Sequence, residues 1–152
     1  MHIFIVGPMA SGKSTIGKKL AKTLGVDFID IDKEIERKAG VEISRIFELE
    51  GEEGFREREK KTLKELSGGN DSVISTGGGA VLRIENRELM KSKGKVIYLE
   101  TPVELQLERT LKDKIRPLLS KGNKEETLRS LKKQRDPLYQ EIANITIKQN
   151  NK

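Results

Sequence analysis

The chain has 152 residues and a mass of 17.1 kDa, enough for one domain and little else. Hydrophobic residues make up 34% and no apolar run approaches the roughly 18 residues of a membrane span, so we expect no membrane partner. The absence of cysteine excludes a disulfide framework, a thiolate zinc site and a cysteine nucleophile. The first residues, MHIFIVGPMASGK, lack the basic segment of a signal peptide, so we expect a cytoplasmic protein.

The charges are numerous and mixed in sign. Thirty Lys and Arg stand against 24 Asp and Glu, a net charge of +6. Both signs alternate within single helical turns, as in GEEGFREREKKTLKEL, which is typical of a solvated helix face. Four Phe, two Tyr and no Trp leave little for base stacking, so we expect no nucleic-acid partner. The positive excess also suits a small polyanionic ligand.

The first half of the chain is expected to alternate strands with helices. Residues 2–6 (HIFIV) form a short apolar, β-branched run that ends at Gly7, which indicates a buried strand. Ile16, Leu20 and Leu24 recur at a spacing of four, so a helix is expected over 14–24. Expected next are a strand over 26–32, a helix over 33–39 with Asp32 as its N-cap, and a charged helix over about 43–66 interrupted near Gly51 and Gly54.

The second half continues the alternation. The expected strands cover 72–76, 95–100 and 145–148, and the expected helices cover 86–93, a segment from Pro102 at the first helical position to residue 107, and about 125–142. Residues 115–123 (IRPLLSKGN) are interpreted as a charged loop, and His2 is expected at the surface. The pattern predicts one α/β domain over residues 1–152, with a parallel sheet wrapped by helices.

A phosphate-binding loop follows the first expected strand. Residues 7–14 (GPMASGKS) satisfy the pattern GxxxxGK[ST] between a strand and a helix. Glycines let successive backbone N–H groups point at a phosphate, and the helix N-terminus adds its positive end. Lys13 can reach the β- and γ-phosphates, and the Ser14 hydroxyl can ligate Mg²⁺. The loop predicts binding of a nucleoside triphosphate with Mg²⁺.

Two aspartates and three glycines are candidates for binding the metal and a second ligand beside the phosphates. Asp30 and Asp32 are two residues apart at the end of the second strand, so both should lie on one face at the edge of the sheet where ligands bind. One could hold the metal's water shell while the other receives a hydroxyl proton, or both could be solvated or helix-capping acids.

Gly77, Gly78 and Gly79 follow the third strand, where an ATPase with such a loop usually carries an acid. They permit close approach of a polyhydroxyl ligand or form an ordinary flexible turn. Without that acid, Asp30 is the best candidate for the metal's second protein contact.

Three arginines are further candidates. Arg116 lies in an expected lid over about 111–124 and could swing onto the transferred phosphate. Arg56 and Arg135 could form forked pairs with a substrate carboxylate. Taken alone, each of the three is more simply interpreted as a surface charge.

The combination resembles the shikimate kinase family over essentially the whole chain. The matching segments are, in order, GPMASGKSTIGKKLA, FIDIDKEIE, FREREK, TGGGAV, IRPLL and RDPLY. The resemblance implies a P-loop NTPase of the nucleoside-monophosphate-kinase fold, a three-layer α/β/α architecture whose five-stranded parallel sheet has the order 2-3-1-4-5. It also implies ATP-dependent phosphorylation of the 3-hydroxyl of shikimate in aromatic amino acid synthesis. It further implies a monomer with a substrate-binding helical segment over about 32–60.

The resemblance also implies individual roles. On the nucleotide side, Ala10, Ser11, Gly12, Lys13, Ser14 and Thr15 hold the ATP phosphates, Ser14 and Asp30 hold Mg²⁺, Arg109 packs on adenine, and Arg116 closes from the lid. On the acceptor side, Asp32 holds the shikimate hydroxyls as base or orienter, Arg56 and Arg135 bind the carboxylate, Gly77, Gly78 and Gly79 line the ring, and Phe47, Phe55 and Glu59 form the wall. Lys13, Asp32 and Arg116 would then be the catalytic set. Ala10 stands where relatives often have Gly.

Two alternatives stay open. Another small-molecule kinase of this fold, such as a gluconate or nucleotide kinase, would share the phosphate loop, but TGGGAV together with IRPLL argues against it. A regulatory or nucleic-acid-binding module that uses ATP should carry a clustered basic face or stacking aromatics, and the sequence shows neither.

Overall fold

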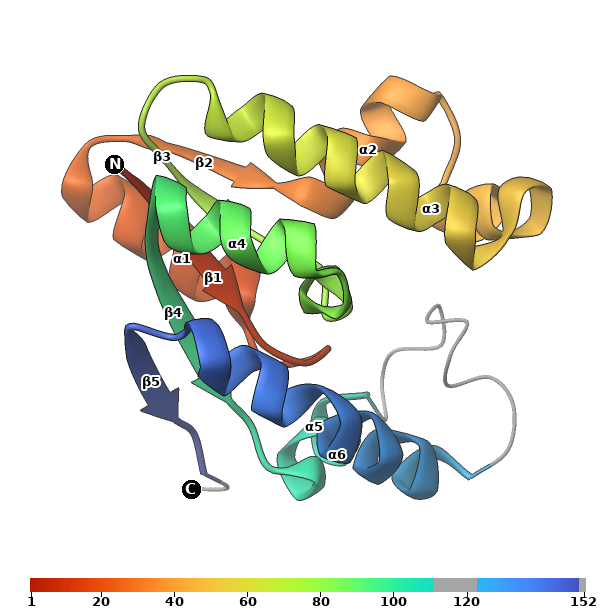
Figure 1. The fold of residues 1–152 in the computed structure, drawn as a ribbon. Helices are drawn as coiled ribbons and strands as arrows, with labels where there is room; N and C mark the ends of the chain where they lie inside the picture. Colours follow the sequence, from red (N-terminus) through yellow and green to blue (C-terminus); the bar gives the residue numbers. More distant parts are fainter. Residues whose placement is uncertain (111–122, 151–152) are drawn as a thin grey trace.

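A computed structural model describes residues 1–110 and 123–150. Its strands are β1 His2–Val6, β2 Asp27–Asp30, β3 Ser72–Ser75, β4 Gly94–Glu100 and β5 Ile145–Lys148. They form one parallel sheet in the order β2-β3-β1-β4-β5 (Figure 1). Strand β1 lies at the centre, where Ile3 is opposite Val73 of β3 and Lys95 of β4. The predicted parallel sheet and its implied strand order are confirmed.

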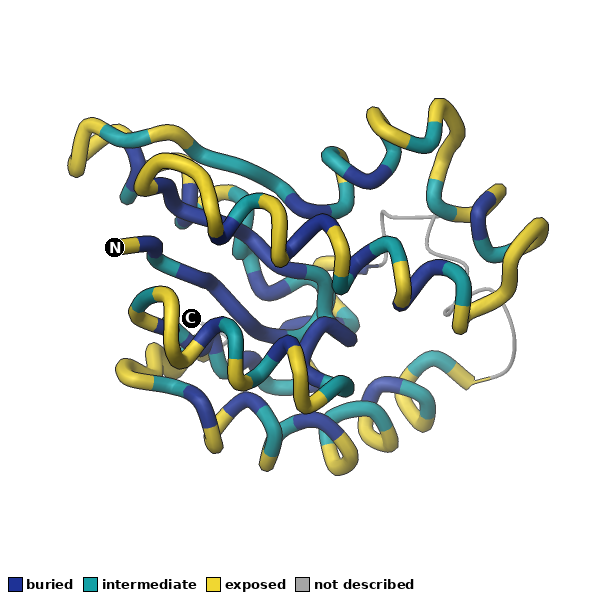
Figure 2. The backbone as a smooth tube through the Cα atoms, turned by 45° about the horizontal axis from the view of Figure 1, so that its top comes forward, coloured by how far each residue is buried: buried dark blue, intermediate teal, exposed yellow. Residues whose placement is uncertain are grey.

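Helices cover both faces of this sheet. They are α1 Lys13–Leu24, α2 Ile31–Ala39, α3 Ile43–Ser67, the 3₁₀ turn η1 Ala80–Leu82, α4 Ile84–Lys93, α5 Val103–Thr110 and α6 Lys124–Ile142. Because side chains alternate along a strand, Phe4 and Val6 of β1 pack with α2, α3, α4 and α6, whereas Ile5 packs on the other face with Ala21 of α1. Figure 2 shows the central strands buried and the helices alternating between buried and exposed turns. The three layers follow from this alternation.

Helix α2 begins earlier than its predicted cap. The prediction of Asp32 as N-cap is wrong, because strand β2 ends at Asp30 and the Asp30 carboxylate accepts hydrogen bonds from the N–H groups of Asp32 (3.0 Å) and Lys33 (3.3 Å). These bonds satisfy two donors of the first turn and start the helix at Ile31. Asp32 therefore lies in the first turn of α2 and not on the strand beside Asp30.

Helix α3 contains a sharp break. Gly51 has φ 73° and ψ −179°, a backbone conformation outside the helix, whereas Gly54 continues the helix. Glycine suits this position because a left-handed φ costs other residues about 1–2 kcal/mol. The predicted interruption near Gly51 is confirmed, and it turns residues 43–50 against the longer part of α3.

Smaller differences concern the ends of elements and one buried residue. Pro102 precedes α5 by one residue, and its carbonyl accepts from the N–H groups of Leu105 and Gln106, so it occupies the cap and not the first helical position. Turn η1 was not predicted. The expected exposure of His2 is wrong: it is 4% exposed, with Nε2 3.0 Å from the Ser67 carbonyl oxygen and Nδ1 3.3 Å from the Ser72 hydroxyl.

Residues 111–122, which include Arg116 and most of the expected lid, lie outside the described residues. Helix α6 follows them, with Asn123 as its N-cap accepting from the Glu126 N–H at 3.2 Å. None of the described helices is long and apolar enough to cross a membrane.

Candidate active site

Two adjoining pockets open where the carboxyl ends of the central strands meet, which is where open α/β sheets bind ligands. The larger pocket has a volume of about 590 Å³ and is lined by residues 9–16, Asp30, Asp32, residues 75–78, Arg109, Thr110 and Gln149. The smaller has a volume of about 170 Å³ and is lined by Met9, Asp32, Ile43, Phe47, Phe55, Arg56, Glu59, residues 77–79 and Arg135. Met9, Asp32, Gly77 and Gly78 line both pockets, so the two spaces share a wall.

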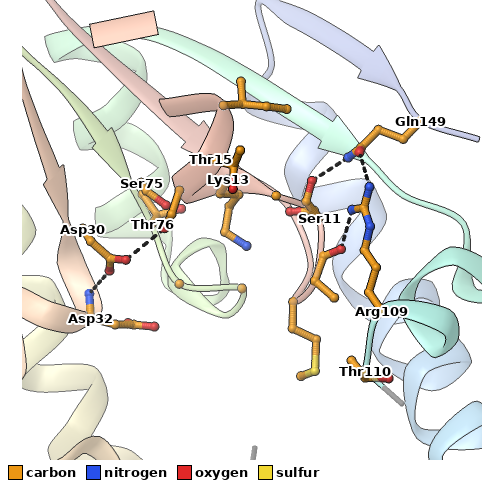
Figure 3. A pocket seen from close by; sticks show the side chains of 17 residues that line it. Ser11, Lys13, Thr15, Asp30, Asp32, Ser75, Thr76, Arg109, Thr110 and Gln149 are labelled. Carbon is orange, nitrogen blue, oxygen red and sulfur yellow. Dashed lines mark hydrogen bonds between the residues drawn. The ribbon is translucent and has the colours of Figure 1, made fainter. Parts of the chain in front are cut away.

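The phosphate loop forms the floor of the larger pocket, between β1 and α1. Gly12 is the N-cap of α1 and offers no side-chain hydrogen bond, and the first turn of the helix holds no acidic residue. A helix N-terminus in this state is a site for an anion, because its first N–H groups lack partners within the helix. The Lys13 ammonium donates to the carbonyls of Gly7 and Pro8, both at 2.8 Å. Figure 3 shows the Lys13 side chain extending into the pocket.

A hydroxyl and a carboxylate meet beside this loop. The Ser14 hydroxyl donates to Asp30 Oδ2 at 3.0 Å, while Asp30 Oδ1 caps helix α2. The pair offers two hard oxygen ligands in one place, as Mg²⁺ prefers when phosphates and water complete its shell. No group of three or more His, Asp or Glu residues suited to a metal occurs among the described residues. The residues present therefore fit Mg²⁺ bound together with a phosphate.

The smaller pocket contains buried charges from two helices. Arg56 of α3 is 9% exposed, donates to Glu59 Oε1 at 2.9 Å, and packs its guanidinium on the Phe55 ring. Glu59 is fully buried, and burial raises its pKa to about 6 despite the lowering effect of Arg56; nearby Asp32 raises the pKa further. Arg135 of α6 is 8% exposed, and its Nε has no hydrogen-bond partner among the described residues. A buried donor without a partner is costly, which favours an anionic ligand at this position.

Three glycines let the chain pass between these side chains. A Cβ added at Gly79 would lie 2.3 Å from Arg56 Nη2, and one at Gly78 would lie 3.4 Å from Arg135 Nη1. A Cβ at Gly77 would lie 3.0 Å from Asp32 Oδ1. The turn is also held from behind, since the Tyr139 hydroxyl donates to the Gly78 carbonyl at 2.5 Å. Both guanidinium groups and Asp32 therefore converge on one glycine turn.

The remaining wall of the smaller pocket is aromatic. Phe47 and Phe55 lie on opposite sides of the Gly51 break, and their rings stack with centroids 4.9 Å apart. The two segments are also joined by a forked ion pair, in which Arg58 donates to both carboxylate oxygens of Glu50 at 2.8 Å. The break in α3 thus brings Phe47 back beside Phe55.

The structure brings the predicted residues together in two groups, with one exception. Ala10 to Thr15, Asp30 and Arg109 line the larger pocket, and every predicted acceptor residue lines the smaller one. Arg116 lies outside the described residues. Sequence reasoning missed Ile16, Ser75, Thr76, Thr110 and Gln149 in the larger pocket, Ile43 in the smaller one, and Met9 in both. Met9, Ile16 and Thr76 lie inside segments that the family resemblance had marked, and the other four belong to no motif.

Comparisons with known proteins concern the family and the fold of the chain. A sequence model of the family described as shikimate kinase matches residues 9–152. A shikimate kinase of Actinobacillus pleuropneumoniae is 56% identical over 146 residues, which cover 96% of this chain and 84% of that protein. The structure of shikimate kinase from Acinetobacter baumannii in complex with shikimate superimposes with a TM-score of 0.95 at 54% identity, covering 99% of this chain and 84% of that one.

More distant structures mark the limit of the resemblance. Shikimate kinase from Aquifex aeolicus has a TM-score of 0.85 at 39% identity, covering 100% of this chain and 89% of that one. A gluconokinase from Sinorhizobium meliloti has a TM-score of 0.61 at 15% identity, covering 99% of this chain and 83% of that one, and at that identity it shares the fold alone. The family match spans nearly the whole chain, and the three proteins above 30% identity named above are all shikimate kinases. The chain belongs to the shikimate kinase family.

Proposed function

We propose that this protein transfers the γ-phosphoryl group of ATP to the 3-hydroxyl of shikimate, giving shikimate 3-phosphate for aromatic amino acid synthesis. The observation that carries the proposal is the shared wall between a phosphate-loop pocket and a smaller pocket holding two buried arginines. A donor phosphate and an acceptor hydroxyl could meet at Asp32, which lines both. Family membership and a relative solved with shikimate supply the identity of the acceptor.

The larger pocket is proposed to hold ATP. The backbone of residues 10–15 would cradle the phosphates at the N-terminus of α1, and Lys13 would exchange its two carbonyl partners for phosphate oxygens. Arg109, at the rim of the pocket, would pack its planar guanidinium on the adenine. Arg116, which lies outside the described residues, is proposed to approach from a lid over about 111–124.

Mg²⁺ is proposed at Ser14 and Asp30. When bound, it would neutralise charge on the β- and γ-phosphate oxygens. Asp30 can serve it through Oδ2 while Oδ1 keeps the cap of α2. This division explains why one carboxylate at the end of β2 can serve the fold and the site together.

The smaller pocket is proposed to hold shikimate. Arg56 and Arg135 would bind its carboxylate, with Glu59 holding Arg56 in place. The turn at residues 77–79 would lie along the ring, and Phe47 and Phe55 would close the apolar side. A carboxylate would give the buried Arg135 Nε the acceptor that it lacks among the described residues and would add negative charge beside Arg56, whereas a neutral polyol would bring no charge.

The transfer itself needs positioning more than covalent help from the protein. The 3-hydroxyl oxygen bonds to the γ-phosphorus as the bond to the β–γ bridging oxygen breaks, and ADP leaves. Asp32 is proposed to orient the hydroxyl and accept its proton. Lys13 and Arg116 would stabilise the charge that develops on the transferred group.

The proposal also covers organisation. We expect residues 1–152 to act as one kinase domain, with the helical segment over about 32–60 binding the acceptor. The family resemblance supports a monomer that acts in the cytoplasm. A gluconate kinase is the second candidate, but the likeness to the gluconokinase concerns the fold alone.

A substrate panel tests the proposal directly. ADP release is measured by a coupled assay with ATP, Mg²⁺ and, in turn, shikimate, shikimate methyl ester, gluconate and nucleoside monophosphates. Shikimate should be the only good acceptor, and the methyl ester should be poor because it lacks the charge that Arg56 and Arg135 would bind. Equal rates with acid and ester would refute the carboxylate assignment, and a faster rate with gluconate would refute the choice of acceptor.

A further inference from the structure

Three consecutive carbonyl groups of the phosphate loop are each held by a side chain from elsewhere in the fold. Gln106 Nε2 donates to the Met9 carbonyl at 3.0 Å, Arg109 Nη1 to the Ala10 carbonyl at 2.7 Å, and Gln149 Nε2 to the Ser11 carbonyl at 2.7 Å. We call Gln106, Arg109 and Gln149 the outer clamp. Figure 3 shows Arg109 and Gln149 on one side of the loop, and Lys13 on the other.

The geometry of the peptide bond makes these contacts relevant to phosphate binding. In a planar trans peptide the C=O and N–H bonds point in opposite directions. Fixing the carbonyls of Met9, Ala10 and Ser11 therefore also fixes the N–H groups of the next residues, Ala10, Ser11 and Gly12. Those N–H groups belong to the stretch that would cradle the phosphates. A clamp outside the loop thus sets the direction of the donors inside it.

The clamp is assembled from two distant segments. Gln106 and Arg109 are three residues apart on α5, so they share a face of that helix. Gln149 follows β5, and its own N–H donates to the Glu100 carbonyl at 2.9 Å. Its side-chain amide is used at both ends: Nε2 also donates to the Thr101 hydroxyl at 3.0 Å, and Oε1 accepts from Arg109 Nη2 at 3.1 Å. Gln149 thereby ties β4, β5 and α5 to the loop.

The clamp also explains how a non-glycine residue is held in the loop. Ala10 has φ 60°, a left-handed conformation that costs an alanine about 1–2 kcal/mol. Such a conformation persists where the surroundings over-determine it. Here the Ala10 carbonyl is bonded to Arg109, and its neighbours on either side are bonded to Gln106 and Gln149.

We propose that Gln106 and Gln149 are positioning residues for ATP, acting on the phosphate loop through its carbonyl groups and not through the nucleobase. The inference rests on the proposed nucleotide site and extends it to two residues outside every motif of the sequence. A competing explanation is that Gln149 merely fixes Arg109 against the base.

Inorganic tripolyphosphate separates these explanations, because it has phosphates and no base. Its affinity and that of ATP are measured by calorimetry for the wild type and for Gln149→Met and Gln106→Met, which keep side-chain length and remove the amide. Gln134→Met is the matched control, since Gln134 is exposed on α6 away from both pockets. A thermal unfolding curve for each variant reports whether it is folded, and Gln149→Met provides a test at a half-exposed position if Gln106→Met does not fold.

We expect Gln149→Met to weaken both tripolyphosphate and ATP by about three- to tenfold, the worth of one or two neutral hydrogen bonds. The KM for ATP should rise by a similar factor while the KM for shikimate stays unchanged, a split that general loss of structure would not give. The loss for tripolyphosphate should persist when the same substitution is made in an Arg109→Met background. Loss for ATP alone, or a loss that disappears in that background, would overturn the proposal in favour of a role through the base.

The inference and the proposed function fail in different ways. If Gln149→Met binds tripolyphosphate as Gln134→Met does, the clamp is refuted, while shikimate-dependent ADP release by the wild type leaves the kinase assignment standing. If the wild type binds neither ATP nor tripolyphosphate, both proposals are wrong.

Discussion

Replacing Gly79 with alanine tests the acceptor pocket through a single methyl group. The added Cβ would lie 2.3 Å from Arg56 Nη2, 2.6 Å from Cζ and 2.7 Å from Nη1, all closer than real Cβ contacts come. The backbone would tolerate the change, because Gly79 has φ −97° and ψ 6°, which alanine can adopt. The guanidinium must therefore move away, although Glu59 holds it at 2.9 Å and Phe55 packs against it.

The size of the effect follows from what Arg56 is proposed to do. A hydrogen bond to a charged group contributes about 1.5–3 kcal/mol, so displacing Arg56 from the shikimate carboxylate should raise the KM for shikimate roughly ten- to a hundredfold. The KM for ATP should change little, since Gly79 does not line the larger pocket. Stability should fall only modestly, because the displaced atoms are at the end of a long side chain.

The assay is ADP release over a range of shikimate concentrations, with Gly69→Ala as the matched control. A Cβ at Gly69 would lie 3.5 Å from the Leu66 carbonyl oxygen, an ordinary contact, so that variant should resemble the wild type. If the effect passes through Arg56, Gly79→Ala should add little to an Arg56→Ala variant, and the double-mutant cycle measures this coupling. An unchanged KM for shikimate in Gly79→Ala, or full additivity with Arg56→Ala, would refute the reasoning.

Three further substitutions test other parts of the site. Lys13→Ala should lower kcat by about a hundredfold or more, because electrostatic stabilisation dominates phosphoryl transfer; near-normal turnover would refute the assignment of the loop. Asp32→Asn should abolish turnover while ATP still binds, whereas Asp30→Asn, which keeps an N-cap, should raise the Mg²⁺ concentration needed; the same metal-dependent defect in both would contradict this division. Glu59→Gln should remove a pH dependence of stability. Since burial raises the Glu59 pKa from 4.5 to about 6, the folded wild type retains a proton that the unfolded chain has lost. Its free energy of unfolding, measured by denaturant titration, should therefore fall by about 1.3 kcal/mol relative to that of the variant as pH rises from 4.5 to 6. An equal pH dependence of stability in the two proteins would show that Glu59 titrates normally.

Features that depend on local periodicity could be predicted from the sequence. The strands could be predicted because buried strands form short β-branched runs. The edge of the sheet at which ligands bind follows from the parallel pairing of these strands. The phosphate loop could be predicted because the spacing of GxxxxGK[ST] determines both the turn of the loop and the start of the helix that follows it. Arg56, Arg135 and residues 77–79 were candidates from their residue types, and the family resemblance supplied their specific roles. The structure brings them to one pocket from α3, α6 and the turn after β3. Their individual roles remain predictions.

Features that depend on contacts between distant segments could not be predicted in this way. Asp30 and Asp32 share a pocket, but not for the reason given by strand alternation, since a side-chain cap ends the strand between them. A histidine at the start of a strand gave no sign that it would be buried, because its partners, Ser67 and Ser72, lie some 70 residues further along the chain. In each case the hydrogen bond that determines the structure cannot be predicted from the pattern of polar and apolar residues.

The phosphate loop shows both kinds of information in one place. Its glycines and lysine define the inner side, which contacts the ligand and is encoded in eight successive residues. Its outer side faces the protein and is completed by Gln106, Arg109 and Gln149, which lie about 100 to 140 residues further along the chain. An alanine at position 10 is therefore not explained by the motif alone. Its left-handed backbone is tolerated because tertiary contacts hold the peptide groups on both sides of it, so the loop's geometry is a property of the whole fold and not only of its signature sequence.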